Sequence, residues 1–276
     1  MKITVLAENQ ALCDELKAEH GLSLWIETKK HKILFDVGAG ELFYDNAKKL
    51  GIDIAQADTM ILSHDHYDHG GGLKTFLQVN EKAKIYMQQE VFGQRYAKDT
   101  SGAMTEIGLD KSLQGNDRFV FVQDELVIDE ELTIFADVDT DIMAPTGNAR
   151  LFMQSKGALK ADDFVHEQNL LLSYGTKKVL FTGCAHRGIV NILEHVYRQT
   201  GRYADVVIGG FHLFDLNVQH AVDEENIRQI GRYMQKTGKM YYTGHCTGQD
   251  AYEVLKEMLC AKIEPLCGGS VIIIDE

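Results

Sequence analysis

Proline is scarce in this sequence. Its 276 residues include only two, Pro145 and Pro265. No proline-rich linker therefore divides the chain into independent units. Hydrophobic residues make up 45% of the chain and charged residues 25%, which is typical of a globular protein with a substantial core. We expect a single domain that spans residues 1–276.

Basic residues are few relative to acidic ones. Lys and Arg total 28 against 41 Asp and Glu, so the net charge is -13. A surface with this charge repels the phosphates of nucleic acids and of anionic membranes. The composition disfavours nucleic acid as a partner and leaves a small-molecule substrate as the expected one.

Cysteines and long apolar runs are also limited. The five cysteines form an odd and scattered set: Cys13, Cys184, Cys246, Cys260 and Cys267. Such a set does not resemble a disulfide framework. Residues 1–6 have the pattern of a strand rather than of a secretory signal, and no later stretch is apolar enough to span a bilayer. We expect a cytoplasmic protein with no membrane segment.

Histidine, in contrast, is concentrated in one short stretch. His64 and His66 follow the apolar run Met60-Ile61-Leu62, and their spacing directs both rings to the same side of a strand. A turn then brings Asp68 and His69 close to them, and the glycines at 70–72 allow the tight path that this requires. Imidazole and carboxylate are good zinc ligands. The stretch therefore predicts the core of a two-metal site.

Three further histidines follow predicted strands. His186, His212 and His245 each lie in a glycine-containing turn after a short apolar segment. Strand ends meet at the rim of a sheet, where active sites commonly form. Residues 247–250 also resemble a capping box that opens a helix after His245. We expect these histidines to converge on the first motif.

The remaining chain alternates predicted strands with predicted helices, which favours a layered α/β architecture. Helical spacing of apolar residues covers residues 41–50, 72–79, 189–198, 223–236 and 249–259. The pattern weakens over residues 88–116 and again over 137–161. We interpret residues 88–116 as a loop-rich insertion near the mouth of the site, where such segments often shape substrate binding.

The motif His64-x-His66-x-Asp68-His69 resembles the signature of the metallo-β-lactamase-fold superfamily. Segments 182–186, 209–213 and 243–248 are similar to those of the dihydropterin-ribofuranosylaminobenzene-phosphate synthase-like subfamily. The resemblance implies an αββα sandwich with the metals at one edge between the sheets. It also implies two divalent cations, zinc before manganese or iron, and a substrate with a phosphorylated ribose or pterin-like part.

The resemblance suggests two ligand schemes. In the first, His186 joins His64 and His66 at one metal, while Asp68, His69 and His245 hold the other. In the second, His166 replaces His186, and Cys184 joins the Asp68 group, because Cys184 stands where the superfamily has a bridging aspartate. Asp36 follows a predicted strand, and it either fixes the tautomer of a ligand imidazole or caps a helix.

The predicted activity is metal-assisted hydrolysis of an ester-like bond. Paired cations activate a water molecule and polarise a carbonyl or phosphoryl oxygen. Asp68 would orient the nucleophile, and His212 would donate a hydrogen bond to a developing oxyanion or a phosphate. Two alternatives stay open: a di-iron redox enzyme on the same fold, and a non-catalytic protein that binds or senses a ligand through the metal site.

Overall fold

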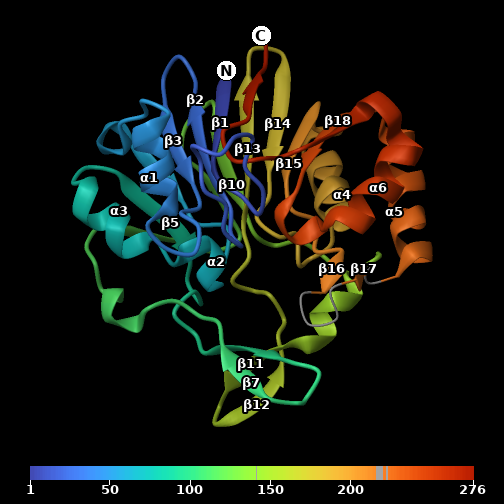
Figure 1. Cartoon of the computed structure of the whole chain (residues 1–276), viewed down its shortest axis with the longest axis horizontal. Coiled ribbons are helices and arrows are strands. Elements are labelled where there is room, and N and C mark those ends of the chain that lie inside the picture. Colours follow the sequence, from blue (N-terminus) through green and yellow to red (C-terminus); the bar gives the residue numbers. More distant parts are fainter. Residues whose placement is uncertain (141, 216–219, 222) are drawn as a thin grey trace.

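Two seven-stranded β-sheets lie face to face at the centre of the computed structural model, which describes residues 1–140, 142–215, 220–221 and 223–276 (Figure 1). The first sheet has the order β20 (Val271–Ile273), β1 (Lys2–Ala7), β2 (Ser23–Glu27), β3 (Lys32–Phe35), β4 (Thr59–Ile61), β5 (Lys84–Gln88), β8 (Phe119–Val122). The second has the order β19 (Ile263–Pro265), β18 (Met240–Thr243), β15 (Val206–Gly209), β14 (Lys177–Phe181), β13 (Asn169–Tyr174), β10 (Leu132–Phe135), β9 (Glu125–Val127).

Helices cover the outer face of each sheet (Figure 1). Helices α1 (Leu42–Lys49) and α3 (Leu73–Val79) lie outside the first sheet, and α4 (Ile189–Thr200), α5 (Glu224–Thr237) and α6 (Gln249–Leu259) lie outside the second. The short helix α2 (Tyr67–Gly70) lies at one end of the sheets. This αββα sandwich confirms the architecture that the family resemblance implied. None of the helices in the described ranges is long and apolar enough to cross a membrane.

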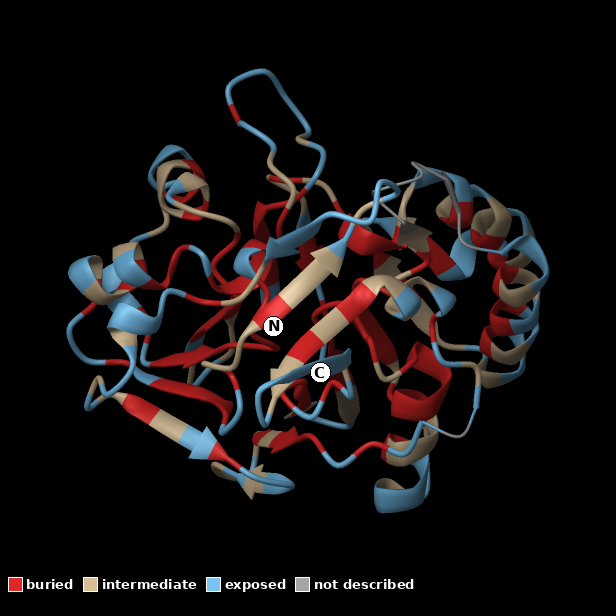
Figure 2. Ribbon diagram, turned by 90° about the horizontal axis from the view of Figure 1, so that it is seen from below, coloured by how far each residue is buried: buried red, intermediate tan, exposed pale blue. Residues whose placement is uncertain are grey.

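Successive side chains of a strand point to opposite faces of its sheet. The buried apolar residues therefore form three layers, one between the sheets and one beneath the helices on each outer face. In β1, Ile3 and Val5 face the core between the sheets, whereas Leu6 packs in the layer beneath the outer helices of the first sheet. Phe35 and Phe181 meet across the two sheets, with ring centroids 5.9 Å apart. Buried residues accordingly predominate in most strands of the two seven-stranded sheets, while the outer helices expose their far sides (Figure 2).

The predicted capping box at residues 247–250 is wrong. Helix α6 begins after Gly248, whose φ of 73° is left-handed. The hydroxyl of Thr247 is engaged elsewhere: it accepts a hydrogen bond from Phe211 N at 3.0 Å and pairs with the hydroxyl of Thr243 at 2.6 Å. Thr247 therefore ties the turn after β15 to the turn after β18.

The stretches expected to be loop-rich contain strands. A four-stranded accessory sheet has the order β12 (Ala158–Ala161), β11 (Leu151–Ser155), β6 (Arg95–Lys98), β7 (Met104–Glu106). It lies near α2, at the opposite end of the molecule from the termini (Figure 1). Strands β7 and β12 are exposed along their whole length, so they lack the apolar alternation that marks a half-buried strand.

Several short elements complete the described chain. The 3₁₀ helices are η1 (Ile54–Gln56), η2 (Lys111–Leu113), η3 (Thr146–Arg150), η4 (His245–Thr247) and η5 (Cys260–Lys262). A small two-stranded sheet pairs β16 (Phe214–Asp215) with β17 (His220–Ala221).

Candidate metal centre

The metal-binding candidates converge because parallel strands end at one edge. Strands β3, β4 and β5 are parallel in the first sheet, and β14, β15 and β18 are parallel in the second. The candidates that follow these strands are buried: His64, His66, Asp68, His69, Cys184, His186 and His245 are all at most 7% exposed. The strand-end argument thus places the residues of the first motif beside histidines far away in the sequence.

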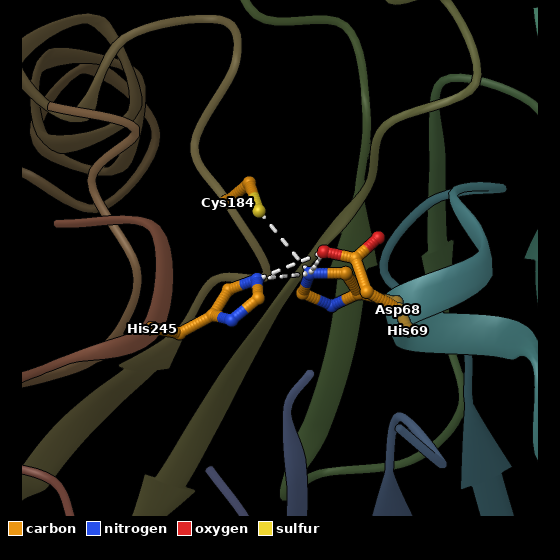
Figure 3. A group of neighbouring side chains, drawn as sticks. All are labelled: Asp68, His69, Cys184 and His245. Atoms are coloured by element: carbon orange, nitrogen blue, oxygen red, sulfur yellow. Dashed lines mark hydrogen bonds and ion pairs between the residues drawn. The ribbon is translucent and has the colours of Figure 1, made fainter. Parts of the chain in front are cut away.

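Four of these side chains point toward one another (Figure 3). The Nε2 atom of His69 lies 3.0 Å from Nε2 of His245 and 3.1 Å from Sγ of Cys184, while Nε2 of His245 lies 3.1 Å from Oδ2 of Asp68. Two imidazoles, one carboxylate and one thiol form a donor set that suits zinc. The chemistry of this group therefore fits a bound divalent cation.

Asp36 orients His69 within this group. Its Oδ2 lies 2.7 Å from Nδ1 of His69, and its two oxygens accept hydrogen bonds from the backbone N and the hydroxyl of Ser63, each at 2.7 Å. Burial alone would lower the pKa of His69, but the charges of Asp36 and Asp68 raise it to about 9. The alternative role as a helix cap is wrong, because Glu41 precedes the first residue of α1.

His245 is held by residues that follow β1. Its Nδ1 lies 3.0 Å from Oδ1 of Asn9, and its backbone N donates to Glu8. Burial raises the pKa of Glu8 to about 7. These contacts direct Nε2 of His245 toward Asp68 and His69.

A second group consists of His64, His66 and His186. Their ring centroids are 4.6, 5.0 and 4.9 Å apart, and in the described structure the Nε2 atom of each is buried with no hydrogen-bond partner. Burial lowers the pKa of all three, that of His66 to about 3, so the rings are neutral near pH 7. Neutral imidazoles with unpaired nitrogens are what a metal ion requires.

His166 lies beside this group, but its two ring nitrogens contact carboxylates instead of the three histidines. Its Nδ1 is 2.8 Å from Oδ1 of Asp65, and its Nε2 is 3.3 Å from Oδ1 of Asp162. Burial would lower the pKa of His166, yet Asp65 and Asp162 raise it to about 9. Both of its nitrogens thus face carboxylates, whereas Nε2 of His186 has no hydrogen-bond partner among the described residues.

Cys184 lies between the two groups. Its sulfur contacts His69 as described, and it also lies within 4.8 Å of a ring nitrogen of His64 and of His186. Burial raises the pKa of its thiol well above the usual range. Cys184 therefore belongs to a candidate ligand set with Asp68, His69 and His245, and to another with His64 and His186.

His212 lies at the rim of the second group, with its ring 4.2 Å from that of His186. Both of its ring nitrogens are without a hydrogen-bond partner among the described residues. Its φ of 49° is left-handed, as is that of His245 at 48°. Strained backbone of this kind clusters at functional sites.

Four further neighbours, like Glu8 and Asn9 beside His245, were not predicted from the sequence. His20 places Nε2 3.3 Å from Oδ2 of Asp68; Cys246 accepts a hydrogen bond from His212 N at 3.3 Å; Asn148 places Oδ1 3.0 Å from Nδ1 of His186. The carboxylate of Glu167 accepts hydrogen bonds from the backbone N of His186 and of Arg187. Only Cys246 and Glu167 carried a signal in the sequence, since each adjoins a candidate histidine.

A cavity of about 460 Å³ opens onto both groups. Apolar side chains in its wall include Tyr67, Ile107, Leu151 and Phe214, and the accessory sheet contributes β6, β7 and β11 residues on one side. The volume suits a small-molecule ligand. The candidate ligands Asp68, Cys184 and His186 lie at its inner surface.

Fold and site together define a known class of protein. Residues 16–245 match the family described as the metallo-beta-lactamase superfamily. The chain belongs to this superfamily.

Its relatives agree with the subfamily resemblance. The chain is 28% identical to 7,8-dihydropterin-6-methyl-4-(beta-D-ribofuranosyl)-aminobenzene-5'-phosphate synthase of Methanocaldococcus jannaschii, over 99% of this chain and 96% of that protein. It is also similar to the structure of Tm1679, described as a metal-dependent hydrolase of the beta-lactamase superfamily, with 29% identity, a TM-score of 0.85 and full coverage of both chains. YhfI of Bacillus subtilis, 14% identical with a TM-score of 0.57 over 99% of each chain, shares the fold.

Proposed function

We propose that this protein is a hydrolase that uses two divalent cations, most readily zinc, to cleave an ester-like bond in a small molecule. The observation that carries the proposal is the pair of adjacent donor groups at the inner surface of the cavity. In one, the buried Nε2 atoms of His64, His66 and His186 have no partner among the described residues. In the other, Asp68, His69 and His245 converge.

The side chains have distinct roles in this proposal. When bound, the cations supply an activated water and polarise the substrate oxygen. Asp36 and Asn9 hold the rings of His69 and His245 in place, at 2.7 and 3.0 Å. Asp68 would hold the second cation and orient the nucleophile, and His212, at the rim of the cavity, donates a hydrogen bond to the oxyanion or phosphate of the substrate.

The first substrates to test carry a phosphorylated ribose or a pterin-like ring. The name of the synthase from Methanocaldococcus jannaschii contains both parts. The mixed wall of the cavity supports a ligand of this kind, because apolar residues such as Tyr67 and Phe214 lie in it together with Arg150. A panel should also contain generic esters, since the description of Tm1679 states only metal-dependent hydrolysis.

The test compares His66→Ala, Asp68→Ala and His186→Ala with the wild-type protein. Bound zinc is measured by elemental analysis, and hydrolysis is measured with a ribose phosphate, bis(4-nitrophenyl) phosphate, a lactone and a thioester. Each variant should lose bound metal and at least about 100-fold in activity, because removing a ligand is more severe than removing a group that orients one. Full activity in His66→Ala and Asp68→Ala would refute the proposal.

His195→Gln is the matched control. His195 lies on α4 and stacks on Phe135 at 4.8 Å, on the far side of the second sheet from the core between the sheets. It should retain the wild-type metal content and activity. A wild-type protein that binds no zinc, manganese or iron would also overturn the proposal.

A further inference from the structure

Four buried ionisable side chains form a closed ring of ion pairs next to the candidate ligand His66. Asp65, Arg95, Asp162 and His166 have side chains that are at most 1% exposed. Arg95 Nε lies 3.1 Å from Asp65 Oδ2 and 3.5 Å from Asp162 Oδ2. His166 closes the ring, at 2.8 Å from Asp65 and 3.3 Å from Asp162.

These four residues belong to separate parts of the fold. Asp65 lies between His64 and His66 in the metal motif. Arg95 is the first residue of β6 in the accessory sheet, and Asp162 follows β12 of the same sheet directly. The ring of ion pairs therefore connects the accessory sheet to the metal motif.

The chemistry of the ring does not suit a third cation. Asp65, His66 and His166 lie close enough together to hold one. However, Arg95 places its guanidinium against the carboxylates of Asp65 and Asp162, and its positive charge offsets part of theirs. Gly93 makes room for it, because a Cβ at that position would collide with the guanidinium. Burying these charges is tolerable only while each has its partners.

We propose that Arg95 and Asp162 are positioning residues that lock the accessory sheet onto the metal motif. Through Asp65 they fix the backbone that carries His64 and His66. Through β6 they also fix the part of the cavity wall that includes Ala97, and Ile107 of the same wall donates its backbone N–H to Arg95 O at 2.9 Å. The inference rests on the proposed function, since it concerns the same metal motif.

The test uses cobalt(II) as the probe metal and three variants, Arg95→Met, Arg95→Lys and Asp162→Asn. Visible absorption reports the geometry around bound cobalt, chelator competition gives its affinity, and amide hydrogen exchange reports the mobility of β6 and β11. Arg95→Met and Asp162→Asn should weaken cobalt binding by about 10-fold or more, alter its spectrum and speed exchange in both strands. Arg95→Lys should recover part of each change, because it keeps the charge but not the planar fork.

Arg118→Met is the matched control. Arg118 donates hydrogen bonds to the backbone oxygens of Asn80 and Leu77 at the end of α3, at 2.6 and 3.3 Å, and makes none to the metal motif among the described residues. It should leave the cobalt spectrum, the affinity and the exchange in β6 unchanged. A folded Arg95→Met protein with wild-type cobalt binding and wild-type exchange would overturn the inference.

A second variant separates this inference from the proposed function. Asp65→Asn changes a residue of the metal motif and leaves the sequence of the accessory sheet intact, and it should speed exchange in β6 and β11, which lie in another sheet. If the wild-type protein binds no cobalt, the proposed function fails, yet the exchange result still decides the inference. Unchanged exchange in Asp65→Asn would refute it.

Discussion

Single residues at strand ends adopt backbone conformations that side chains other than glycine rarely take. Asp36, Ala185, His212 and His245 have φ values between 48° and 56°, and each follows a strand at the edge that carries the site. Aspartate and asparagine tolerate this conformation better than most residues. Asp36 can therefore be changed to asparagine without disturbing the backbone, which isolates the role of its charge.

Asp36→Asn should weaken metal binding at the group formed by Asp68, His69 and His245. The carboxylate holds Nδ1 of His69 at 2.7 Å, and an amide in its place removes the charge that fixes this ring. Replacing such an orienting group costs about 10–100-fold in metal affinity. Competition with a chelator, monitored by zinc release, measures the change.

Asp45→Asn serves as the control for this experiment. Asp45 lies on α1 and pairs at the surface with Lys48 at 2.6 Å, so its loss should leave zinc affinity unchanged. Equal zinc affinity in Asp36→Asn and wild type would show that the charge of Asp36 does not support the site.

Among the elements, the parallel strands β14, β15 and β18 are also held together at their N-terminal ends, opposite the ends that carry the site. Asp205, just before β15, accepts a hydrogen bond from Lys178 N at 2.9 Å and pairs with Lys239 at 3.0 Å. Burial would raise the pKa of Asp205, but these two partners lower it. The carboxylate thus ties together the starts of three strands whose other ends carry the site.

Asp205→Asn should lower the free energy of unfolding by about 1–2 kcal/mol at pH 7. Because the folded pKa of Asp205 is below the unfolded value of about 3.9, its stabilisation is fully present above that value and is lost as the pH falls through the folded pKa. The difference between wild type and variant should therefore shrink from pH 5 to pH 3. Urea denaturation at several pH values measures it, with the exposed Asp14→Asn as control. A difference that stays constant or grows on acidification would contradict this account.

The elements differ in how well the sequence predicted them. The expected ranges 189–198, 223–236 and 249–259 agree closely with α4, α5 and α6, because each has a continuous apolar face that packs on the second sheet. Strands β7 and β12 were missed because exposed strands need no apolar alternation. Their pairing depends on β6 and β11, which are more than 50 residues apart in the sequence.

For the site, too, the features that are visible in the local sequence differ from those that depend on contacts between distant segments. His64, His66, Asp68 and His69 could be predicted because they are contiguous and follow an apolar strand. The choice between His166 and His186 could not, because it depends on where Asp65 and Asp162 lie in space. His20 was missed for a similar reason, since only the fold brings it within 3.3 Å of Asp68.

At the scale of the whole molecule, the site depends on the two sheets staying together, because each sheet supplies part of both donor groups. The first sheet carries His64, His66 and Asp68, and the second carries His186 and His245. The core between the sheets, to which Phe35 and Phe181 belong, is what holds them in register. The two sheets should therefore unfold together rather than one after the other.

Phe181→Ala tests this coupling, since Phe181 is fully buried on β14 and its loss leaves a cavity between the sheets. We expect the free energy of unfolding to fall by about 3–5 kcal/mol in the presence of a chelator. Trp25, the only tryptophan, lies in the first sheet and reports that sheet by fluorescence. Its transition should shift to lower urea together with the circular dichroism signal, whereas Val127→Ala, at a position 60% exposed on β9, should shift neither. A Trp25 transition that stays at its wild-type midpoint would show that the sheets unfold independently.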